Sequence, residues 1–347
     1  MSPSSNRPVV FVQTNDAREN RVVGYASASD GALSDAGSWP SGGRGSGQPH
    51  LASQSSLVAD EQGTRLFVVN AGSGDVSCFA IAEDGLTLLD RAPVGSAPTS
   101  ITIHGDLAYV LCTGSPAGIT ALRIAADGTL SPIDGSSRAL SAPDADPAQI
   151  AFSPDGATLV VTERGTDSIS SFAVDAHGLA SGPVVVASSG KTPYGCEFTR
   201  DGALVVTEAA GGQVGAASAS SYRLGEAARL TTVSGPIANT RSEVCWAAIS
   251  PDDRFAFVTN FGDGTISSFA IAADGAISLL EPVAGSTVDG QKGIRDEAIS
   301  TDGRFLYALH ADVQKVFGWG IGADGTLAPM GSYGAGLPET VAGLAVV

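Results

Sequence analysis

Short apolar runs separated by Gly- and Asp-rich turns recur along the whole chain. Each unit begins with a short strand, passes through a turn such as "SPDG" at 153–156, and continues into a second apolar strand. A Gly/Asp turn, a third strand, a turn such as "ADGTL" at 126–130 and a fourth strand follow. Asp-Gly between apolar runs is a strong hairpin signal, because glycine accepts the positive φ that these turns require. The pattern predicts antiparallel units of four strands.

The second strand of this unit recurs seven times. "SPDGATLVVTERGTDSISSF" at 153–172 and "SPDDRFAFVTNFGDGTISSF" at 250–269 align without a gap. The ends of the seven second strands lie 42 to 55 residues apart, at Asn15, Asn70, Cys112, Glu163, Glu208, Asn260 and His310. No segment shows helical periodicity. Seven four-stranded units with this period predict an all-β fold, the seven-bladed β-propeller.

The two ends of the chain predict how the ring closes. The N-terminal segment "PVVFVQTN" at 8–15 reads as a second strand, and "VAGLAVV" at 341–347 resembles a first strand. The C-terminal strand would therefore complete the N-terminal blade and leave no open sheet edge. We expect residues 1–347 to form a single propeller domain.

One rim of this propeller is the predicted location of a functional site. Strands in a blade run antiparallel, so the starts of first strands and the ends of second strands share a rim, and the first strands line a central channel. The first strands begin near Ser55, Thr99, Ala148, Tyr194, Cys245, Arg295 and Gly343. This rim varies from blade to blade and carries a Gly-rich loop at 208–222, whereas the "SPDG" face has repetitive turns.

Charge and cysteine content exclude several classes of function. The net charge is −17 with no Lys/Arg cluster, which argues against a nucleic-acid or anionic-membrane partner. No apolar run approaches the roughly 20 residues of a membrane helix. The four cysteines are widely spaced, which favours buried free thiols in a reducing compartment over a zinc site or disulfides. We expect a cytoplasmic protein, a monomer or weak homo-oligomer, with a small-molecule substrate.

Specific stretches of the repeat resemble a known family. "FSPDGATLVVTERGTDSISSF" at 152–172, "ISTDGRFLYALH" at 299–310 and "GIRDEAI" at 293–299 are similar to the seven-bladed propeller lactonases. Bacterial 6-phosphogluconolactonases and fungal carboxymuconate cyclases belong to that family. The resemblance covers essentially the whole chain and implies the propeller fold with lactonase or cycloisomerase chemistry.

The family's proposed catalytic residues are only partly present. The "HPH" motif position reads Asp146-Pro147-Ala148, and the "PRH" position reads Pro193-Tyr194-Gly195. Two histidines and one arginine are therefore absent. The family's glutamate matches Glu208, and its last arginine matches Arg295, which Asp296 follows. A phosphorylated sugar lactone or a tricarboxylate would require more cationic groups than remain.

Four rim residues are candidates for catalysis. Glu208 is a candidate general base, because apolar neighbours would raise its pKa; the alternative is a carboxylate that caps backbone amides. Glu163 would assist proton transfer, or bond the backbone of the following turn. Arg295 would orient the substrate or stabilise an oxyanion, or else form an ion pair with an adjacent acid. His310 would act as an acid or base, or be a structural rim histidine.

Further rim residues are expected to line a substrate pocket: Tyr194, Asp146, Asp296, Cys245, Trp246, Arg164 and Arg44. Glu and Asn side chains at the second-strand ends also suggest a calcium site. They lie one strand away from the axis, so neither a metal nor another cofactor is expected.

Two functions remain open. One is a lactone hydrolase or cycloisomerase acting on a small acidic or polyoxygenated metabolite. The other is a non-catalytic propeller that binds a small molecule or a protein, which the missing family histidines and arginine favour.

Overall fold

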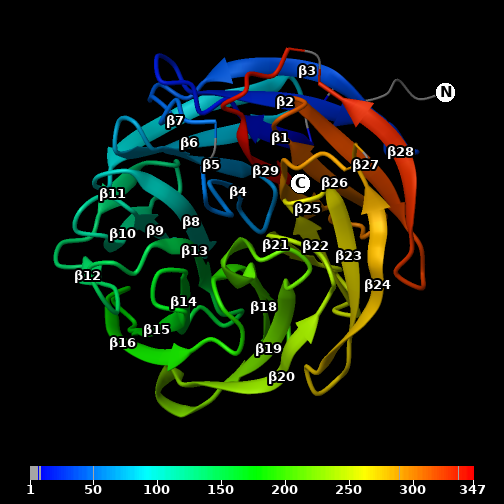
Figure 1. The fold of residues 1–347 in the computed structure, drawn as a ribbon. Coiled ribbons are helices and arrows are strands. Elements are labelled where there is room, and N and C mark those ends of the chain that lie inside the picture. The colour runs from blue at the N-terminus through cyan, green and yellow to red at the C-terminus, as the bar shows by residue number, and fades with distance from the viewer. Residues whose placement is uncertain (1–6, 8, 50, 289, 335) are drawn as a thin grey trace.

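The chain folds into a ring of seven antiparallel sheets around a central axis (Figure 1). The computed structural model describes residues 7, 9–49, 51–288, 290–334 and 336–347. Within them, no helix is long and apolar enough to cross a membrane. The all-β, seven-bladed prediction is confirmed.

The first three blades follow the predicted order from axis to periphery. Blade 1 contains β29 (Ala342–Val346), β1 (Val10–Gln13), β2 (Arg21–Ser27) and β3 (Leu33–Pro40). Blade 2 contains β4 (Leu57–Ala59), β5 (Arg65–Asn70), β6 (Asp75–Ala82) and β7 (Gly85–Pro93). Blade 3 contains β8 (Pro98–His104), β9 (Leu107–Cys112), β10 (Gly118–Ile124) and β11 (Leu130–Pro132), and the short β12 (Arg138–Ala139) also pairs with β10.

The other four blades repeat this order. Blade 4 contains β13 (Pro147–Phe152), β14 (Thr158–Glu163), β15 (Ser168–Val174) and β16 (Ala180–Ala187). Blade 5 contains β17 (Pro193–Phe198), β18 (Ala203–Glu208), β19 (Ser218–Leu224) and β20 (Leu230–Ala238), with short 3₁₀ turns at Ala210–Gly212 and Glu226–Ala228. Blade 6 contains β21 (Val244–Ile249), β22 (Phe255–Asn260), β23 (Thr265–Ile271) and β24 (Ile277–Ser286). Blade 7 contains β25 (Ile294–Ile299), β26 (Phe305–His310), β27 (Lys315–Ile321) and β28 (Leu327–Tyr333).

The C-terminal strand closes the ring as predicted. Strand β29 pairs antiparallel with β1, with Val346 opposite Val10 and Leu344 opposite Val12. Blade 1 is therefore built from strands near both ends of the chain. Strand β1 is paired on both sides, with β29 and with β2, so neither of its edges is left open.

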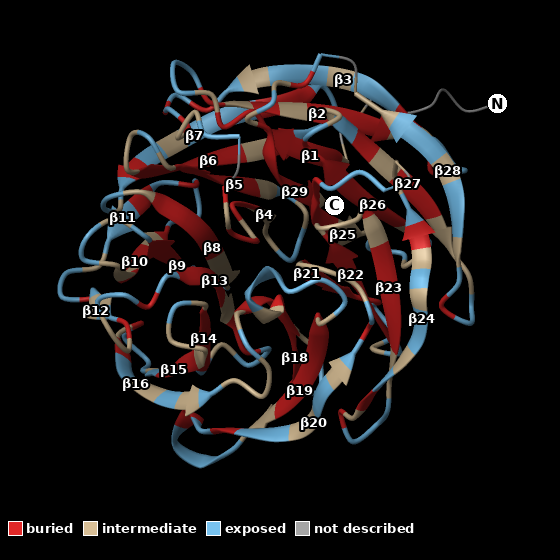
Figure 2. Ribbon diagram, viewed as in Figure 1, coloured by how far each residue is buried: buried red, intermediate tan, exposed pale blue. Residues whose placement is uncertain are grey.

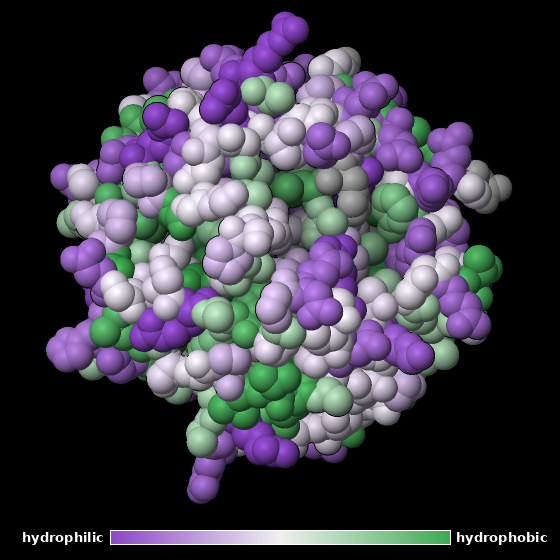
Figure 3. Space-filling view, turned by 60° about the vertical axis from the view of Figure 1, so that its left-hand side comes forward, coloured by the Kyte–Doolittle hydropathy of each residue, from purple (hydrophilic) through white to green (hydrophobic). Residues whose placement is uncertain are grey.

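Strands near the axis and in the middle of each blade are more buried than the strand at the periphery. Figure 2 shows the inner and middle strands buried and the outermost strand of each blade largely exposed. All six residues of β18 are buried, whereas Leu230 is the one buried residue of β20. The apolar core lies between adjacent blades, where side chains such as Tyr109 of blade 3 and Phe172 of blade 4 share one cluster. Figure 3 shows that hydrophobic residues on one side of the surface form patches of limited size.

The "SPDG" turns are stabilised by a repeated hydrogen-bond pattern. The Ser153 hydroxyl donates to Asp155 at 2.6 Å and accepts from the Thr158 amide at 3.0 Å. Ser250 with Asp252 and Ser300 with Asp302 repeat the contact at 2.6 Å. The Ser153 hydroxyl, followed by the Ala157 amide, lowers the pKa of Asp155 below its ordinary value of 3.8, which outweighs the opposing effect of burial.

The central channel lies among the first strands of the blades, as predicted. It has a volume of about 610 Å³, and residues of the "SPDG" face such as Pro154, Pro251 and Thr301 are part of its lining. The channel therefore opens on the turn face. Figure 1 shows β4 and the loop before it reaching inward toward the axis.

Residues 51–56, hereafter the plug, cross the channel at its other end. The Gln54 side chain donates to the Ala247 carbonyl at 2.7 Å and accepts from the Ala247 amide at 3.1 Å, which joins blade 2 to blade 6. The Ser53 hydroxyl donates to the Ala148 carbonyl of blade 4. These contacts make the channel blind at the rim that was expected to carry the site.

Replacing Asp155 tests the electrostatic role of the turn carboxylates. The folded state holds the pKa of Asp155 below its unfolded value, so this residue stabilises the fold above about pH 4 and loses that effect as pH falls further. We expect Asp155→Asn to lower the melting temperature at pH 6, and the difference from the wild type to shrink at pH 3. Circular dichroism melts over this range measure it.

The matched control is Asp84→Asn, at a turn carboxylate with no such hydrogen bond among the described residues. This control should melt like the wild type at both pH values. An Asp155→Asn deficit that stays constant or grows on acidification would contradict the assignment.

Candidate functional site

The polar residues at the second-strand ends have a structural role in two blades that carry asparagine. The Asn70 amide donates to Ser77 at 2.8 Å and its oxygen accepts from Asn20 at 2.9 Å. Asn260 likewise donates to Ser267 at 2.9 Å. Both asparagines are fully buried. Each ties its strand to the third strand of the same blade.

Glutamate replaces asparagine by reversing the direction of the serine hydrogen bond. Glu163 accepts from Ser170 at 2.6 Å, from Thr166 at 3.0 Å and from the Ser141 amide at 3.1 Å. The Ser141 hydroxyl also donates to it. In the asparagine blades the serine hydroxyl accepts from the amide and donates to a backbone carbonyl, Ser77 to that of Ser41. A carboxylate can therefore join the second strand to the third, as asparagine does in other blades, where hydroxyl and amide donors surround it.

Glu208 is enclosed in the same way. It accepts from Ser218 at 2.6 Å, from the Gly190 amide at 2.9 Å and from the Ser220 hydroxyl. Burial raises the pKa of Glu208, and the Ser218 and Ser220 hydroxyls oppose that change. Neither Glu208 nor Glu163 belongs to the lining of the rim pocket described below. Their positions favour the structural alternative over a catalytic base.

Arg295 holds the segment that precedes the plug. Its guanidinium donates to the Pro49 carbonyl, approaches Asp312 at 3.4 Å, and lies 5.6 Å from the centre of the Phe261 ring. The side chain is buried, which lowers its pKa. Arg295 thus positions the chain entering the plug beside the pocket.

Asp296 and His310 of blade 7 are also buried. Asp296 accepts from the Gly343 amide at 2.9 Å, which fastens the start of β29, and burial raises its pKa to about 7. The His310 ring lies 6.1 Å from that of Phe317, and burial lowers its pKa. Neither residue lines the rim pocket.

A rim pocket of about 340 Å³ unites four of the predicted residues, Asp146, Arg164, Tyr194 and Cys245. They come from the starts of first strands and the end of a second strand in blades 4, 5 and 6, as the topology predicted. Trp246 packs beneath, with its ring 5.4 Å from that of Tyr194. Arg44 is exposed and lies near Ser73 of blade 2, to which its backbone amide donates, and it is not part of this lining.

Arg164 is the positively charged group of the pocket. It pairs with Asp146 at 2.6 Å, donates to the Tyr194 hydroxyl at 3.1 Å, and lies 4.8 Å from the centre of the Tyr194 ring. Asp146 has a positive φ of 43°, an unusual backbone conformation for a residue other than glycine. These contacts hold one guanidinium in a fixed orientation at the pocket.

Cys245 is a poor nucleophile where it lies. Its thiol donates to the Glu243 carbonyl at 3.2 Å, and burial raises its pKa, as it also does for Tyr194. Both groups therefore stay neutral near physiological pH and act as lining.

Sequence reasoning missed Glu243, which lines the same pocket. It directly precedes β21, two residues before the predicted Cys245, and its φ is 52°. A Cβ on Gly212 would lie 3.2 Å from its Oε1, so the glycine turn after β18 leaves space beside the carboxylate. Among the described residues, no side chain hydrogen-bonds this carboxylate. Thr192 and Phe261 complete the wall with Ala209 and Gly211.

Comparison with known families agrees with this architecture. Residues 45–316 match the family described as "Lactonase, 7-bladed beta-propeller". The chain belongs to this family. No curated protein sequence matches it significantly.

Solved structures share the fold of this lactonase-family chain at low identity. A periplasmic gluconolactonase of Pseudomonas aeruginosa is 19% identical with a TM-score of 0.74, covering 96% of this chain and 98% of that one. A functionally unknown protein of Desulfotomaculum acetoxidans is 14% identical with a TM-score of 0.76, covering 98% of both chains.

Substitution of Glu208 separates structural from catalytic roles. Glu208→Ala would leave several buried donors without an acceptor, so we expect the free energy of unfolding to fall by about 3 kcal/mol. Glu208→Gln keeps one acceptor oxygen and should cost less. Chemical denaturation measures both, with the exposed Glu281→Ala as the control. A Glu208→Gln variant of native stability that has lost all turnover would restore the catalytic assignment.

Proposed function

We propose that this lactonase-family chain hydrolyses a small polyoxygenated lactone in the rim pocket. The observation that carries the proposal is the arrangement of Arg164, oriented by Asp146 and Tyr194, in the same pocket as the Glu243 carboxylate. A cation and a carboxylate beside a lactone carbonyl are the two groups that ester hydrolysis needs. The pocket volume of about 340 Å³ lies in the range of small-molecule sites.

In this mechanism Glu243 is the general base. It takes a proton from a water molecule as the water oxygen attacks the lactone carbonyl carbon. Arg164 stabilises the negative charge that develops on the carbonyl oxygen. The bond from the carbonyl carbon to the ring oxygen then breaks, and the ring oxygen receives the proton held by Glu243. The product is the open hydroxy acid, and both groups return to their starting states.

The charges in the pocket narrow the substrate class. Two carboxylates, Asp146 and Glu243, accompany the single guanidinium of Arg164 in the lining. A phosphorylated lactone or a tricarboxylate would meet more repulsion than attraction here. A neutral sugar-type lactone fits better. Its hydroxyl groups would donate hydrogen bonds to the Asp146 and Glu243 carboxylates, and its ring face would pack on Phe261. The same groups would serve a cycloisomerase that moves a proton to or from carbon.

The alternative is a non-catalytic binding propeller. One observation favours it: Asp146-Pro147-Ala148 replaces the histidines of the family motif, and Asp146 is engaged by Arg164. In that case the pocket would hold a polyol or lactone without turnover.

Glu243→Gln tests the base. Removing a general base typically costs about 10²–10⁴-fold in rate, so we expect a fall of that size in kcat on the best substrate. The fold should be retained, because no described side chain depends on this carboxylate. The assay is pH-stat titration of a panel of neutral sugar lactones with the purified chain. Arg164→Met should lower kcat/KM by about 10²-fold or more.

The matched control is Glu281→Gln, an exposed glutamate of β24 that should leave the rate unchanged. Wild-type rates in Glu243→Gln would refute the base assignment. Saturable lactone binding without turnover in the wild type would establish the binding alternative.

A further inference from the structure

The blind central channel is a second cavity, separate from the rim pocket. The channel has a volume of about 610 Å³, and its lining includes Gln54 and Ser55 of the plug. On the other side of the plug, Ala52 packs against the apolar cluster that contains Tyr194 and Cys245, two residues of the rim-pocket lining. The plug therefore lies between the two cavities, and a ligand reaches the channel from the turn face.

Three carboxyl groups lie along this channel, and those of Asp296 and Glu297 are buried. Glu197 accepts from the Ile249 amide at 2.9 Å through Oε2, while its residue keeps partial exposure to the channel. Asp296 accepts from the Gly343 amide through one oxygen. Burial raises the pKa of Glu197 to about 8 and that of Asp296 to about 7.

Glu297 is the most unusual of the three. It is 4% exposed, and neither carboxylate oxygen has a hydrogen-bond partner among the described residues. Burial, followed by repulsion from the nearby Glu197 carboxyl group, raises the pKa of Glu297 well above 4.5, and the Thr259 backbone opposes this change only partly. A buried polar group without a hydrogen-bond partner is costly, so a bound donor would stabilise this carboxyl group, which the described side chains leave unpaired.

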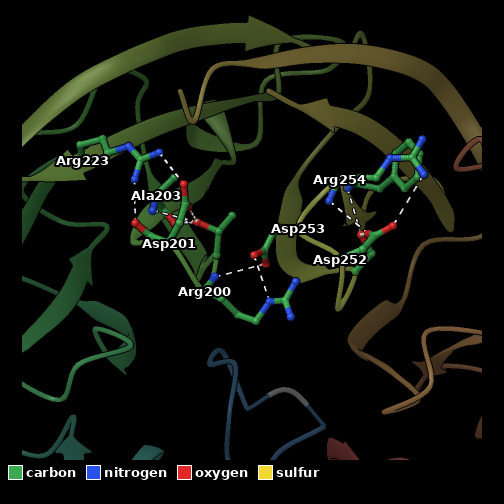
Figure 4. A network of polar contacts seen from close by, with 10 residues as sticks. Arg200, Asp201, Ala203, Arg223, Asp252, Asp253 and Arg254 are labelled. Atoms are coloured by element: carbon green, nitrogen blue, oxygen red, sulfur yellow. Dashed lines mark hydrogen bonds and ion pairs between the residues drawn. The ribbon is translucent and has the colours of Figure 1, made fainter. Parts of the chain in front are cut away.

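The channel contains little positive charge to balance these groups. Arg200 is the only basic residue of the described lining. Its side chain is 73% exposed and pairs with Asp253 at 3.1 Å, in the network of turn residues that Figure 4 shows. Asp60 and Glu61 add further acidic residues to the lining. The cavity as a whole therefore attracts cations.

The surroundings favour an organic cation over a chelated metal ion. Among the described residues, no three His, Cys, Asp or Glu side chains are grouped to hold a metal. Much of the wall is apolar, with Leu57, Ile101 and Ala248 among the lining residues. A chain of methylene groups with a terminal ammonium matches an apolar wall that carries buried carboxylates.

We propose that the central channel binds a small linear alkylammonium ion, with its ammonium group on Glu197 and Glu297. The ammonium has three N–H donors, and the Glu197 oxygen not used by Ile249 and the unpartnered Glu297 oxygens are acceptors. The alkyl chain lies along the apolar wall toward the turn face. This site is independent of the proposed lactone hydrolysis.

The test uses diaminobutane as the probe and butanediol as its neutral counterpart of similar shape. At pH 9, above the raised pKa of Glu197, and at constant ionic strength, calorimetric titration should give saturable binding of the diamine, and the melting temperature should rise with its concentration. The diol should do neither. Equal effects of diamine and diol, or binding of calcium chloride without binding of the diamine, would overturn the proposal.

Two variants locate the site. Glu197→Gln keeps an acceptor for the Ile249 amide but removes the charge, and it should weaken diamine binding by about tenfold or more. Glu297→Gln should do the same; if it does not fold, Glu197→Gln alone decides. Glu281→Gln is the surface control, and Glu243→Gln should bind the diamine as the wild type does, which separates this site from the rim pocket. Unchanged affinity in Glu197→Gln would refute the site.

Discussion

The pairing of β29 with β1 is the constraint on which the rest of the molecule depends. Each blade buries its apolar faces against two neighbours, so an open ring would expose the flanks of two blades and an unpaired strand. Closure uses apolar partners such as Leu344 opposite Val12, and Asp296 of blade 7 fixes the entry of the closing strand through the Gly343 amide. Once the ring is closed, the seven first strands surround the axis, and both cavities follow from their positions.

The same repeat assigns different roles to its polar positions. In four of the blades the residue at the end of the second strand faces a serine hydroxyl of the third strand, as Asn70 faces Ser77 and Glu208 faces Ser220. These side chains join the second strand to the third, and Glu163 and Glu208 do not line the rim pocket. Where one blade has asparagine and another has glutamate, the direction of the hydrogen bond to the serine is reversed, but the two strands stay joined. Positions at the starts of first strands and just before them, such as Tyr194 and Glu243, line the rim pocket instead.

Most of the fold was predictable because hairpin turns and apolar alternation are local signals. The ends of β14 and β22 fall at Glu163 and Asn260, as the aligned repeats predict.

The pocket residues Arg164 and Tyr194 were also predictable, because topology alone brings those strand ends together. Glu243 lies beside a predicted residue and was within reach of the same reasoning. The structural role of Glu208 was partly visible in the serines of its own blade.

The plug was not predictable from local pattern. Gln54 bonds Ala247 across 193 residues of sequence, and Arg295 bonds the Pro49 carbonyl across 246. Neither contact is part of the repeated blade pattern, so the periodicity of the sequence does not predict either of them. A segment outside the repeat thus lies between the two cavities.

The plug also explains why one molecule can hold two environments of different charge. On the rim side, Arg164 gives the pocket a fixed positive group beside carboxylates, which suits polarisation of a carbonyl. On the channel side, Glu197 and the buried Glu297 face a described lining whose basic residue, Arg200, pairs with Asp253 instead. Without the plug, ligand and solvent would pass from one side to the other. The side-chain hydrogen bonds of Gln54 to the Ala247 backbone hold the plug between the two cavities, so each cavity keeps its own charge.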